Sequence, residues 1–319
     1  MKPKSDYAFI VGSSNAYSFG LISTMNAQNY FKTNADWEIV HDDLWDPRHR
    51  ERITEAFPFN VNWYRLDTLI SEYKNSFVDK RSNQAYPMLD PWFPVSLLAR
   101  KLLKEGKYKS VCLLQADQFV FANLDIYFKI SESGIFISGE FPFSFAKVQD
   151  MPFGNDKGIW DRSMCAAFDS INFSGYQYSE VFFDLVNFQT EDPFKGEATH
   201  PMICHNRSIC KHVPKDRILG LDRYLWVCDS IWAETLLRIG PTGDTIFNSI
   251  GQQLYGWHCR WWQEGRIASE LDIHKNSKDV IDKIEYNYNL VKSFMEKFNN
   301  MIPEISSDVY EKGFIKRPK

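Results

Sequence analysis

Short, mostly apolar runs of strand length recur along the first 130 residues of the chain. Residues 7–11, 37–40 and 110–114 form three such runs, and a fourth strand is expected near 60–64. Apolar runs of this length are typical of strands that are buried on both faces. The pattern therefore predicts a buried and largely parallel sheet.

Stretches with helical spacing separate these runs. Apolar residues recur at roughly helical spacing in two places, Leu21, Ile22, Met25 and Tyr30, and then Val95, Leu98, Leu102 and Leu103. The second stretch lies between Pro94 and Gly106, which are typical helix boundary residues. Strands that alternate with helices predict an α/β domain with helices flanking the sheet.

Beyond Gly134 the pattern is weaker. A strand is expected at 135–138, and residues 141–220, which are rich in Phe, Pro, Gly and Asp, predict loops and mixed strands. A clear amphipathic helix is predicted near the C-terminus by the spacing of Ile281, Ile284, Tyr288, Val291, Met295 and Phe298. We expect one domain over residues 1–278, followed by a C-terminal helix and tail at 279–319.

Composition and charge argue against two classes of function. The 319-residue chain has a formal net charge of −4, and its densest basic block is the short run 48–52. A protein that binds duplex nucleic acid normally carries a basic stripe, so nucleic acid is not an expected partner. No apolar stretch approaches the roughly 20 residues of a membrane span.

The cysteines and the N-terminus bear on the compartment. None of the six cysteines forms a CxxC pair, and the cluster of Cys204, His205, Cys210 and His212 does not have the spacing of a usual zinc site. The first residues do not read as a signal peptide. We expect reduced thiols and a cytoplasmic protein.

Polar residues follow three of the expected strands. They lie at 12–15, at Asp42 and Asp43, and at 115–117. Ligands of open α/β sheets bind beyond the carboxyl ends of the strands, so this convergence predicts a polar ligand at that edge.

The segment at the end of the strand expected at 110–114 makes the prediction of a ligand site more specific. Residues 113–128 read LLQADQFVFANLDIYF. This segment resembles the DxD block of glycogenin-like glycosyltransferases, which reads roughly L-D-A-D-x-L-V-x-x-N-x-D-x-L-F, and Tyr108 stands where that family has a Tyr before the strand. The resemblance covers about 15 positions and is far more specific than an isolated DxD.

The N-terminal segment carries a second resemblance. Residues 11–20 read VGSSNAYSFG and are similar to the family's opening L-T-T-N-D-A-Y-x-x-G. The resemblance implies that Val11, Ser13 and Ser14 hold the nucleotide and that Tyr17 stacks on its base. Asp43, at the next strand end, is expected beside the same nucleotide.

The family's chemistry needs a divalent cation. Mg²⁺ or Mn²⁺ bridges the oxygens of a nucleoside diphosphate and is held by one or two carboxylates. Asp117 aligns with the last Asp of DxD and is the expected metal ligand. Gln115 replaces the first Asp, and as a neutral amide it is expected to contact ribose rather than to bind metal strongly.

Three further residues are implied by the resemblance near the C-terminus and before the DxD strand. The family's late metal-binding His, followed by a Lys on the diphosphate, fits His274 and Lys278, although the family's Gly is missing and the spacing is shorter; His258 is the alternative metal ligand. The family's basic residue before the DxD strand falls on Ala99, next to Arg100, which is the expected substitute.

One motif resembles the part of the family's sequence that faces the acceptor of the sugar. Residues 242–248, TGDTIFN, resemble the family's G-D-Q-x-x-L-N, which implies that Asp244 faces the reacting centre; helix capping is the alternative role.

Together these resemblances predict a GT-A type fold with a Rossmann-like, mostly parallel sheet. Residues 1–130 would form its nucleotide-binding half and residues 131–278 its acceptor-side half. They imply transfer of a sugar from a UDP-sugar, assisted by Mn²⁺ or Mg²⁺ and with retained configuration, to a glycan, protein, lipid or other acceptor.

Two alternative functions stay open. Gln115 favours a non-catalytic nucleotide-sugar binding protein. A sugar-nucleotide pyrophosphorylase shares this kind of sheet but would need a basic, glycine-rich turn after the first strand.

Overall fold

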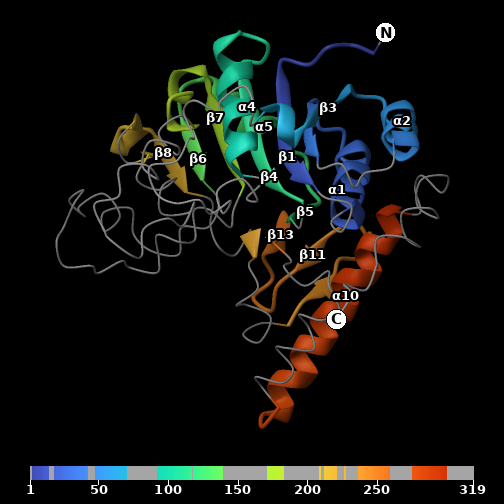
Figure 1. Ribbon diagram of the computed structural model, residues 1–319. Helices are drawn as coiled ribbons and strands as arrows, with labels where there is room; N and C mark the ends of the chain where they lie inside the picture. The colour runs from blue at the N-terminus through green and yellow to red at the C-terminus, as the bar shows by residue number, and fades with distance from the viewer. Residues whose placement is uncertain are drawn as a thin grey trace, which may run out of the picture.

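A seven-stranded sheet forms the centre of the molecule (Figure 1). The structure is a computed structural model that describes residues 2–13, 18–41, 47–69, 92–116, 118–138, 171–182, 208–209, 212–220, 226–227, 236–258 and 275–299. The strands of the sheet follow the order β3-β2-β1-β4-β7-β6-β8. Their bounds are β1 (Tyr7–Ser13), β2 (Asp36–His41), β3 (Val61–Arg65), β4 (Ser110–Gln115), β6 (Phe136–Ser138), β7 (Asn172–Gly175) and β8 (Ile218–Gly220).

The first four strands are parallel, which confirms the predicted sheet. β1 pairs with β2 and β4, and β2 pairs with β3, all in parallel. β7 then enters between β4 and β6 and is antiparallel to both, while β6 and β8 are parallel. The sheet is therefore mixed but mostly parallel, and the insertion of β7 was not visible in the sequence pattern.

Helices cover both faces of the sheet. They are α1 (Ser18–Tyr30), α2 (Pro47–Ala56), α4 (Trp92–Lys104) and α5 (Asp125–Glu132), with 3₁₀ turns at Tyr176–Tyr178 and Lys215–Arg217. One buried cluster joins α1, α2 and α5 to the sheet, and a second joins α4 to the other face. Alternate strand residues feed the two clusters, as the period of two requires. The predicted helices around Met25 and Leu98 are confirmed, whereas α2 and α5 were not predicted.

Two small sheets lie beyond the main one. One is the antiparallel meander β10 (Arg238–Ile239), β11 (Ile246–Phe247) and β12 (Gln253–Leu254). The other joins β5 (Gln118–Val120) to β13 (Gly256–His258) and β9 (Trp226–Val227). β5 follows two residues after β4, so this second, separate sheet lies next to the carboxyl edge of the main sheet.

The predicted C-terminal helix is α10 (Lys278–Asn299), and it contributes to a core of its own. The Phe294 ring lies 6.0 Å from Phe119 and 5.3 Å from Phe121, and the Phe298 ring lies 5.7 Å from Tyr30. The other end of α10 projects past the small sheets (Figure 1). None of the helices in the described ranges combines the length and the apolarity that crossing a bilayer requires.

Candidate functional site

The carboxyl ends of the parallel strands meet at one edge of the sheet, as predicted. In register, Ser13 lies opposite His41, His41 lies opposite Arg65, and Gly12 lies opposite Gln115. Ser13 and His41 are 5% and 3% exposed, and Gln115 is half-buried. The predicted residues Ser13 and Gln115 are thus brought to the same edge, on the adjacent strands β1 and β4.

The turn after β4 is closed by a side chain that the sequence pattern did not single out. The Gln118 Oε1 accepts a hydrogen bond of 2.9 Å from the backbone N–H of Gln115. Gln118 is 1% exposed, and its own carbonyl accepts a hydrogen bond of 2.8 Å from the Thr24 hydroxyl on α1. The two ends of the QADQ turn are therefore held against β4 and against α1.

The helix α1 also holds the next residues of β5. The Gln28 Nε2 donates to the carbonyl of Val120 at 3.0 Å and to that of Ala122 at 3.1 Å. Polar side chains inside a helix-to-sheet interface are costly unless they are paired. Thr24 and Gln28 are paired with backbone, so their role is to fix the segment that follows the site.

The tail of the DxD-like block has a structural role. The Asn123 Nδ2 donates to the Phe31 carbonyl at 2.8 Å, and the Asp125 Oδ1 accepts from the Asn34 N–H at 2.8 Å. The Phe128 ring packs 5.1 Å from Tyr7 and 5.1 Å from Phe173. The Asn-x-Asp-x-x-Phe pattern therefore fastens α5 to the chain between α1 and β2.

A second polar pair at the edge was not predicted. The Arg50 Nη1 lies 2.9 Å from the His41 Nε2, which places one nitrogen of a guanidinium at the end of β2. The His41 ring also packs edge-on at 5.9 Å from the Trp63 ring. Arg50 belongs to the densest basic block of the sequence, and the position of this block soon after the second strand was the signal that could have revealed it.

Arg65, at the end of β3, is engaged by a neighbouring carboxylate. Its Nε and Nη2 lie 3.1 and 2.7 Å from the two oxygens of Asp67. The hydrogen bond from Arg65 is the largest cause that holds the pKa of Asp67 below its usual value. The pair is exposed, so it neutralises charge without adding much stability.

Val11 lies at the predicted strand but inside the core. Its side chain is 1% exposed and packs in the cluster beneath α1. In register it lies opposite Leu114 and Ile39, two residues before the end of β1. Its side chain is therefore placed to support the edge rather than to contact a ligand.

Arg100 is directed to an ion pair away from this edge. Its Nε lies 3.2 Å from the Glu180 Oε2, and the Lys104 Nζ lies 2.6 Å from the Glu180 Oε1. Burial raises the pKa of Glu180, but hydrogen bonds from Lys104 and Arg100 outweigh burial and hold that pKa below its usual value. Glu180 follows the end of β7 that pairs with the start of β4, so the structure does not bring Arg100 to Gln115.

Asp244 lies at the far end of α1. Its Oδ2 accepts a hydrogen bond of 3.1 Å from the hydroxyl of Tyr30, the last residue of α1, and its Oδ1 accepts from the Thr242 hydroxyl. The Thr242 bond is the largest cause of the lowered pKa of Asp244. Because α1 contacts Gln118 at Thr24 and runs away from the strand ends toward Tyr30, the structure does not place Asp244 beside Gln115. Asp244 lies in the β10–β11 turn and not at a helix start, so the alternative capping role is wrong.

Lys278 is also remote from the edge. It is the exposed first residue of α10, whereas Phe294, near the other end, packs on Phe119 just after the site. Sixteen residues of helix separate the two, or about 24 Å at 1.5 Å per residue. Figure 1 shows this end of α10 projecting from the molecule.

Comparison with known proteins identifies the architecture. No protein-family model matches the sequence, and no curated protein matches it. Among solved structures, mouse xyloside xylosyltransferase 1 is similar at a TM-score of 0.50 and 9% identity, over 80% of this chain and 98% of that one. The fold is of the GT-A type.

Two further GT-A structures show a weaker likeness. The bifunctional glycosyltransferase WbbM is similar at a TM-score of 0.46 and 12% identity, over 72% of this chain and 41% of that one. The glycosyltransferase GlyE of Streptococcus pneumoniae is similar at a TM-score of 0.40 and 9% identity, over 70% of this chain and 46% of that one. At such identities the likeness concerns the fold alone, and function has to be argued from the site.

Five predicted site residues of this GT-A chain lie outside the described residues. They are Ser14, Tyr17, Asp43, Asp117 and His274. Within the described ranges, no group of three or more His, Cys, Asp or Glu side chains is arranged to hold a metal ion.

The alternative His258 does have a described backbone position. β13 pairs antiparallel with β5, and His258 lies opposite Gln118. Gln118 directly follows Asp117 in the chain. The backbone of His258 thus lies beside the turn that carries the DxD-like motif, although 140 residues separate the two in sequence.

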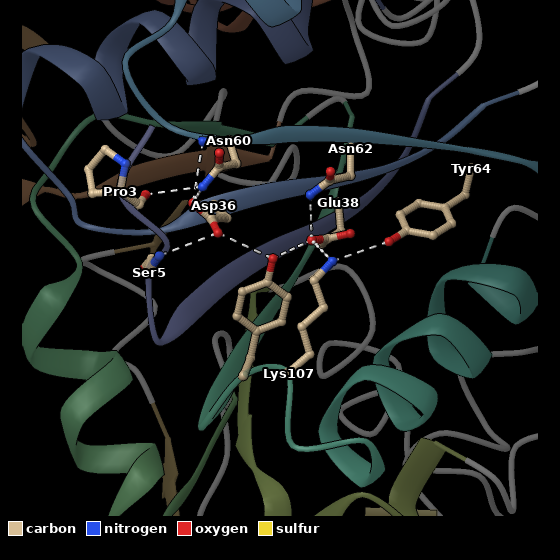
Figure 2. A network of polar contacts seen from close by, with 9 residues as sticks. Pro3, Ser5, Asp36, Glu38, Asn60, Asn62, Tyr64 and Lys107 are labelled. Atoms are coloured by element: carbon tan, nitrogen blue, oxygen red, sulfur yellow. Dashed lines mark hydrogen bonds and ion pairs between the residues drawn. The ribbon is translucent and has the colours of Figure 1, made fainter. Parts of the chain in front are cut away.

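A second polar cluster lies at the opposite, amino edge of the GT-A sheet (Figure 2). The fully buried Glu38 Oε1 accepts from the Lys107 Nζ at 2.8 Å, from the Asn62 Nδ2 at 2.9 Å and from the Tyr108 hydroxyl. Burial raises the pKa of Tyr108, and the charge of Glu38 raises it further, so that this hydroxyl remains a donor.

Asp36 extends the same network. Its Oδ1 accepts from the Asn60 Nδ2 at 3.0 Å, and its Oδ2 accepts from the Tyr108 hydroxyl at 3.3 Å. Burial is the largest cause of the raised pKa of Asp36. Tyr108 therefore ties β2 to the start of β4 and lies at the edge opposite the candidate site.

Proposed function

We propose that this protein is a glycosyltransferase that takes its sugar from a UDP-sugar with the help of Mn²⁺ or Mg²⁺. One observation carries the proposal: the DxD-like turn begins at the carboxyl end of β4, beside the strand that ends at Ser13, in a sheet of the GT-A type. In open α/β sheets this edge is where ligands bind. The turn is also held on both sides by Gln118, as a site that positions a donor requires.

The side chains proposed as metal ligands suit a hard divalent cation. Asp117 would supply a carboxylate oxygen, and a histidine would supply an imidazole nitrogen; Mn²⁺ accepts both kinds of ligand. Of the two histidines, we favour His258 over His274, because the backbone of His258 lies opposite Gln118. A bound cation would neutralise the diphosphate and make it a better leaving group.

The remaining residues would bind and orient the nucleotide. Ser13 and Ser14 would donate hydroxyl hydrogen bonds at the end of β1, and Tyr17 would stack on the base. Gln115 would hydrogen-bond the ribose, since its amide offers both a donor and an acceptor. Asp43 would lie near the same nucleotide. The positions of Arg100, Lys278 and Asp244 do not support their roles in binding or transfer.

Retention of the anomeric configuration and a UDP donor are part of the proposal, and they rest on the resemblance to glycogenin-like enzymes. The acceptor-side half is proposed to lie within 131–278. The proposed acceptor is a glycan, a protein, a lipid or another molecule.

Release of UDP tests the proposal directly. The purified chain would be incubated with UDP-glucose, UDP-galactose, UDP-N-acetylglucosamine and UDP-xylose, each with Mn²⁺, with Mg²⁺ or with EDTA. We expect slow hydrolysis of at least one donor with metal, and its loss in EDTA and in Asp117→Asn. Tight binding of a UDP-sugar without release, with and without candidate acceptors, would favour the non-catalytic binding protein. Formation of UTP from UDP-sugar and pyrophosphate would favour the pyrophosphorylase.

A further inference from the structure

The guanidinium of Arg50 stands out among the charged groups at the carboxyl edge. Arg50 is half-buried on α2, and its Nη1 reaches the His41 side chain at the end of β2. Its Nε is fully shielded from solvent and has no hydrogen-bond partner in the described part of the chain. A shielded N–H of a cationic group that has no acceptor costs folding free energy, so the retention of Arg50 at this edge calls for an explanation.

No carboxylate among the described residues compensates the charge of Arg50. The ion pairs of the described chain engage Arg65 with Asp67 and Arg100 with Glu180, but none engages Arg50. Lys278 lies at the remote end of α10. Arg50 is therefore the one guanidinium at the described edge of the sheet whose charge the described protein leaves uncompensated.

His41 fixes where that charge lies. A guanidinium N–H can only donate a hydrogen bond, so the His41 Nε2 must be the acceptor and carries no proton in this contact. The imidazole is thus in its neutral Nδ1–H form and adds no charge of its own. Because the pair uses one N–H of Nη1 and the Nε is shielded, the second N–H of Nη1 and the two N–H groups of Nη2 are left for a further acceptor.

The position suits a phosphate group of a nucleotide. β2 lies two strands from β4, or about 9.6 Å at 4.8 Å per strand. In the proposed site the diphosphate lies at the turn after β4, next to the end of β1, so the Arg50 side chain would reach its phosphate oxygens across the end of β1. The planar fork of an arginine matches phosphate oxygens, and the bond is stronger because both groups are charged.

We propose that Arg50, held by His41, binds the diphosphate of the nucleotide-sugar donor and supplies the positive charge that Arg100 and Lys278 do not bring to this edge. This inference rests on the proposed function, since it takes the donor to be a nucleoside diphosphate sugar. It assigns a binding role to α2, a helix that neither motif covers.

Calorimetry with three probes tests the inference. UDP, uridine and inorganic pyrophosphate would be titrated into the wild type, Arg50→Ala and the matched control Arg52→Ala, which removes the same charge from the exposed side of the same helix. We expect Arg50→Ala to weaken UDP and pyrophosphate binding about 10- to 100-fold, as for a hydrogen bond to a charged group. Uridine binding should be unchanged, and Arg52→Ala should bind all three probes like the wild type.

A structural role for the pair gives a different result. Equal losses for uridine and UDP, no loss for UDP, or a loss of the same size in Arg52→Ala would overturn the inference. Thermal unfolding without ligand reports whether Arg50→Ala folds. If it does not, Arg50→Lys replaces it: this variant keeps the charge and loses the fork, and UDP binding should weaken about 3- to 10-fold. Unchanged UDP affinity in Arg50→Lys would then count against the phosphate site.

The failure of this inference can be told from the failure of the proposed function. Wild-type protein that binds UDP as tightly as Arg50→Ala contradicts the inference alone. Wild-type protein that binds no nucleoside diphosphate, but whose pyrophosphate binding depends on Arg50, contradicts the proposed function and leaves a phosphate site in place.

Discussion

Both edges of the central sheet carry charged and polar side chains, but the edges differ in how these side chains are paired. At the amino edge, Asp36 and Glu38 accept hydrogen bonds from Asn60, Lys107 and Tyr108 within the protein (Figure 2), while the second oxygen of Glu38, Oε2, has no partner among the described residues. At the carboxyl edge, the Arg50 guanidinium faces a neutral His41, and its Nε has no partner among the described residues.

This difference indicates that the amino edge serves the stability of the fold and that the carboxyl edge serves binding. A buried charge that is paired inside the fold is costly to disturb, because its partner is left behind without compensation. An N–H group at the strand ends that the fold leaves without an acceptor does not stabilise the fold and can donate to a ligand. Substitutions at the amino edge should therefore change stability, and those at the carboxyl edge should change binding and turnover.

The largest effect is expected from Asp117→Asn. Loss of this carboxylate removes the proposed ligand of the metal ion. The ion would stabilise the negative charge of the departing diphosphate, and that charge develops mostly in the transition state. Turnover of the donor should fall by about 10²- to 10³-fold, while the thermal unfolding temperature stays unchanged. Steady-state kinetics and calorimetry on the same preparation would check both halves of this prediction.

Gln115→Asp is the companion to that substitution. It restores the carboxylate of the family's motif at the end of β4, so Mn²⁺ affinity should rise if residue 115 contacts the ion. Retention of near wild-type turnover in Asp117→Asn would remove the proposed catalytic centre from this edge.

At the amino edge, Glu38→Ala should act on stability. It leaves Lys107 without its ion pair and the buried Tyr108 hydroxyl with fewer acceptors. We expect the free energy of unfolding to fall by about 2–4 kcal/mol, measured by urea denaturation, with the affinity for UDP unchanged in the folded fraction. Gln115→Ala, at the other edge, should lower stability by about 1 kcal/mol or less. Equal losses in both variants would erase the contrast between the edges.

A smaller effect is expected from Tyr17→Ala. If Tyr17 stacks on the base, its loss should weaken UDP binding by about 1–3 kcal/mol, as for bases on aromatic side chains. Pyrophosphate, which has no base, should bind this variant as it binds the wild type. Unchanged UDP affinity in folded protein would show that the base lies elsewhere.

The smallest effect is expected from Asp244→Asn. Asp244 contacts Tyr30 at the end of α1 that is remote from Gln115, so donor turnover should stay within about twofold of wild type, equivalent to ~0.4 kcal/mol. A loss of two orders of magnitude, measured with a saturating donor, would show that the β10–β11 turn reaches the reacting centre after all.

The local pattern of the sequence was sufficient for the main elements of the fold. The apolar runs that end at Ser13 and Gln115 and the spacing around Met25, Leu98 and Val291 identified strands and helices correctly, because periodicity reports directly which side of an element is buried. The edge at which Ser13 and Gln115 meet was predictable for a related reason. Parallel strands joined by helices must all end at the same side of the sheet.

The tertiary structure decided which side chains meet. Arg100, Lys278 and Asp244 carry suitable chemistry, but the packing of α4, α10 and the β10–β11 turn directs them to Glu180, to solvent and to Tyr30. His41 and Arg50, nine residues apart, meet because α2 folds back along β2, and His258 lies opposite Gln118 because β13 pairs with β5 across 140 residues. Such contacts depend on the register of strands and the rotation of helices. Both are set by packing between distant segments, which a local sequence pattern does not contain.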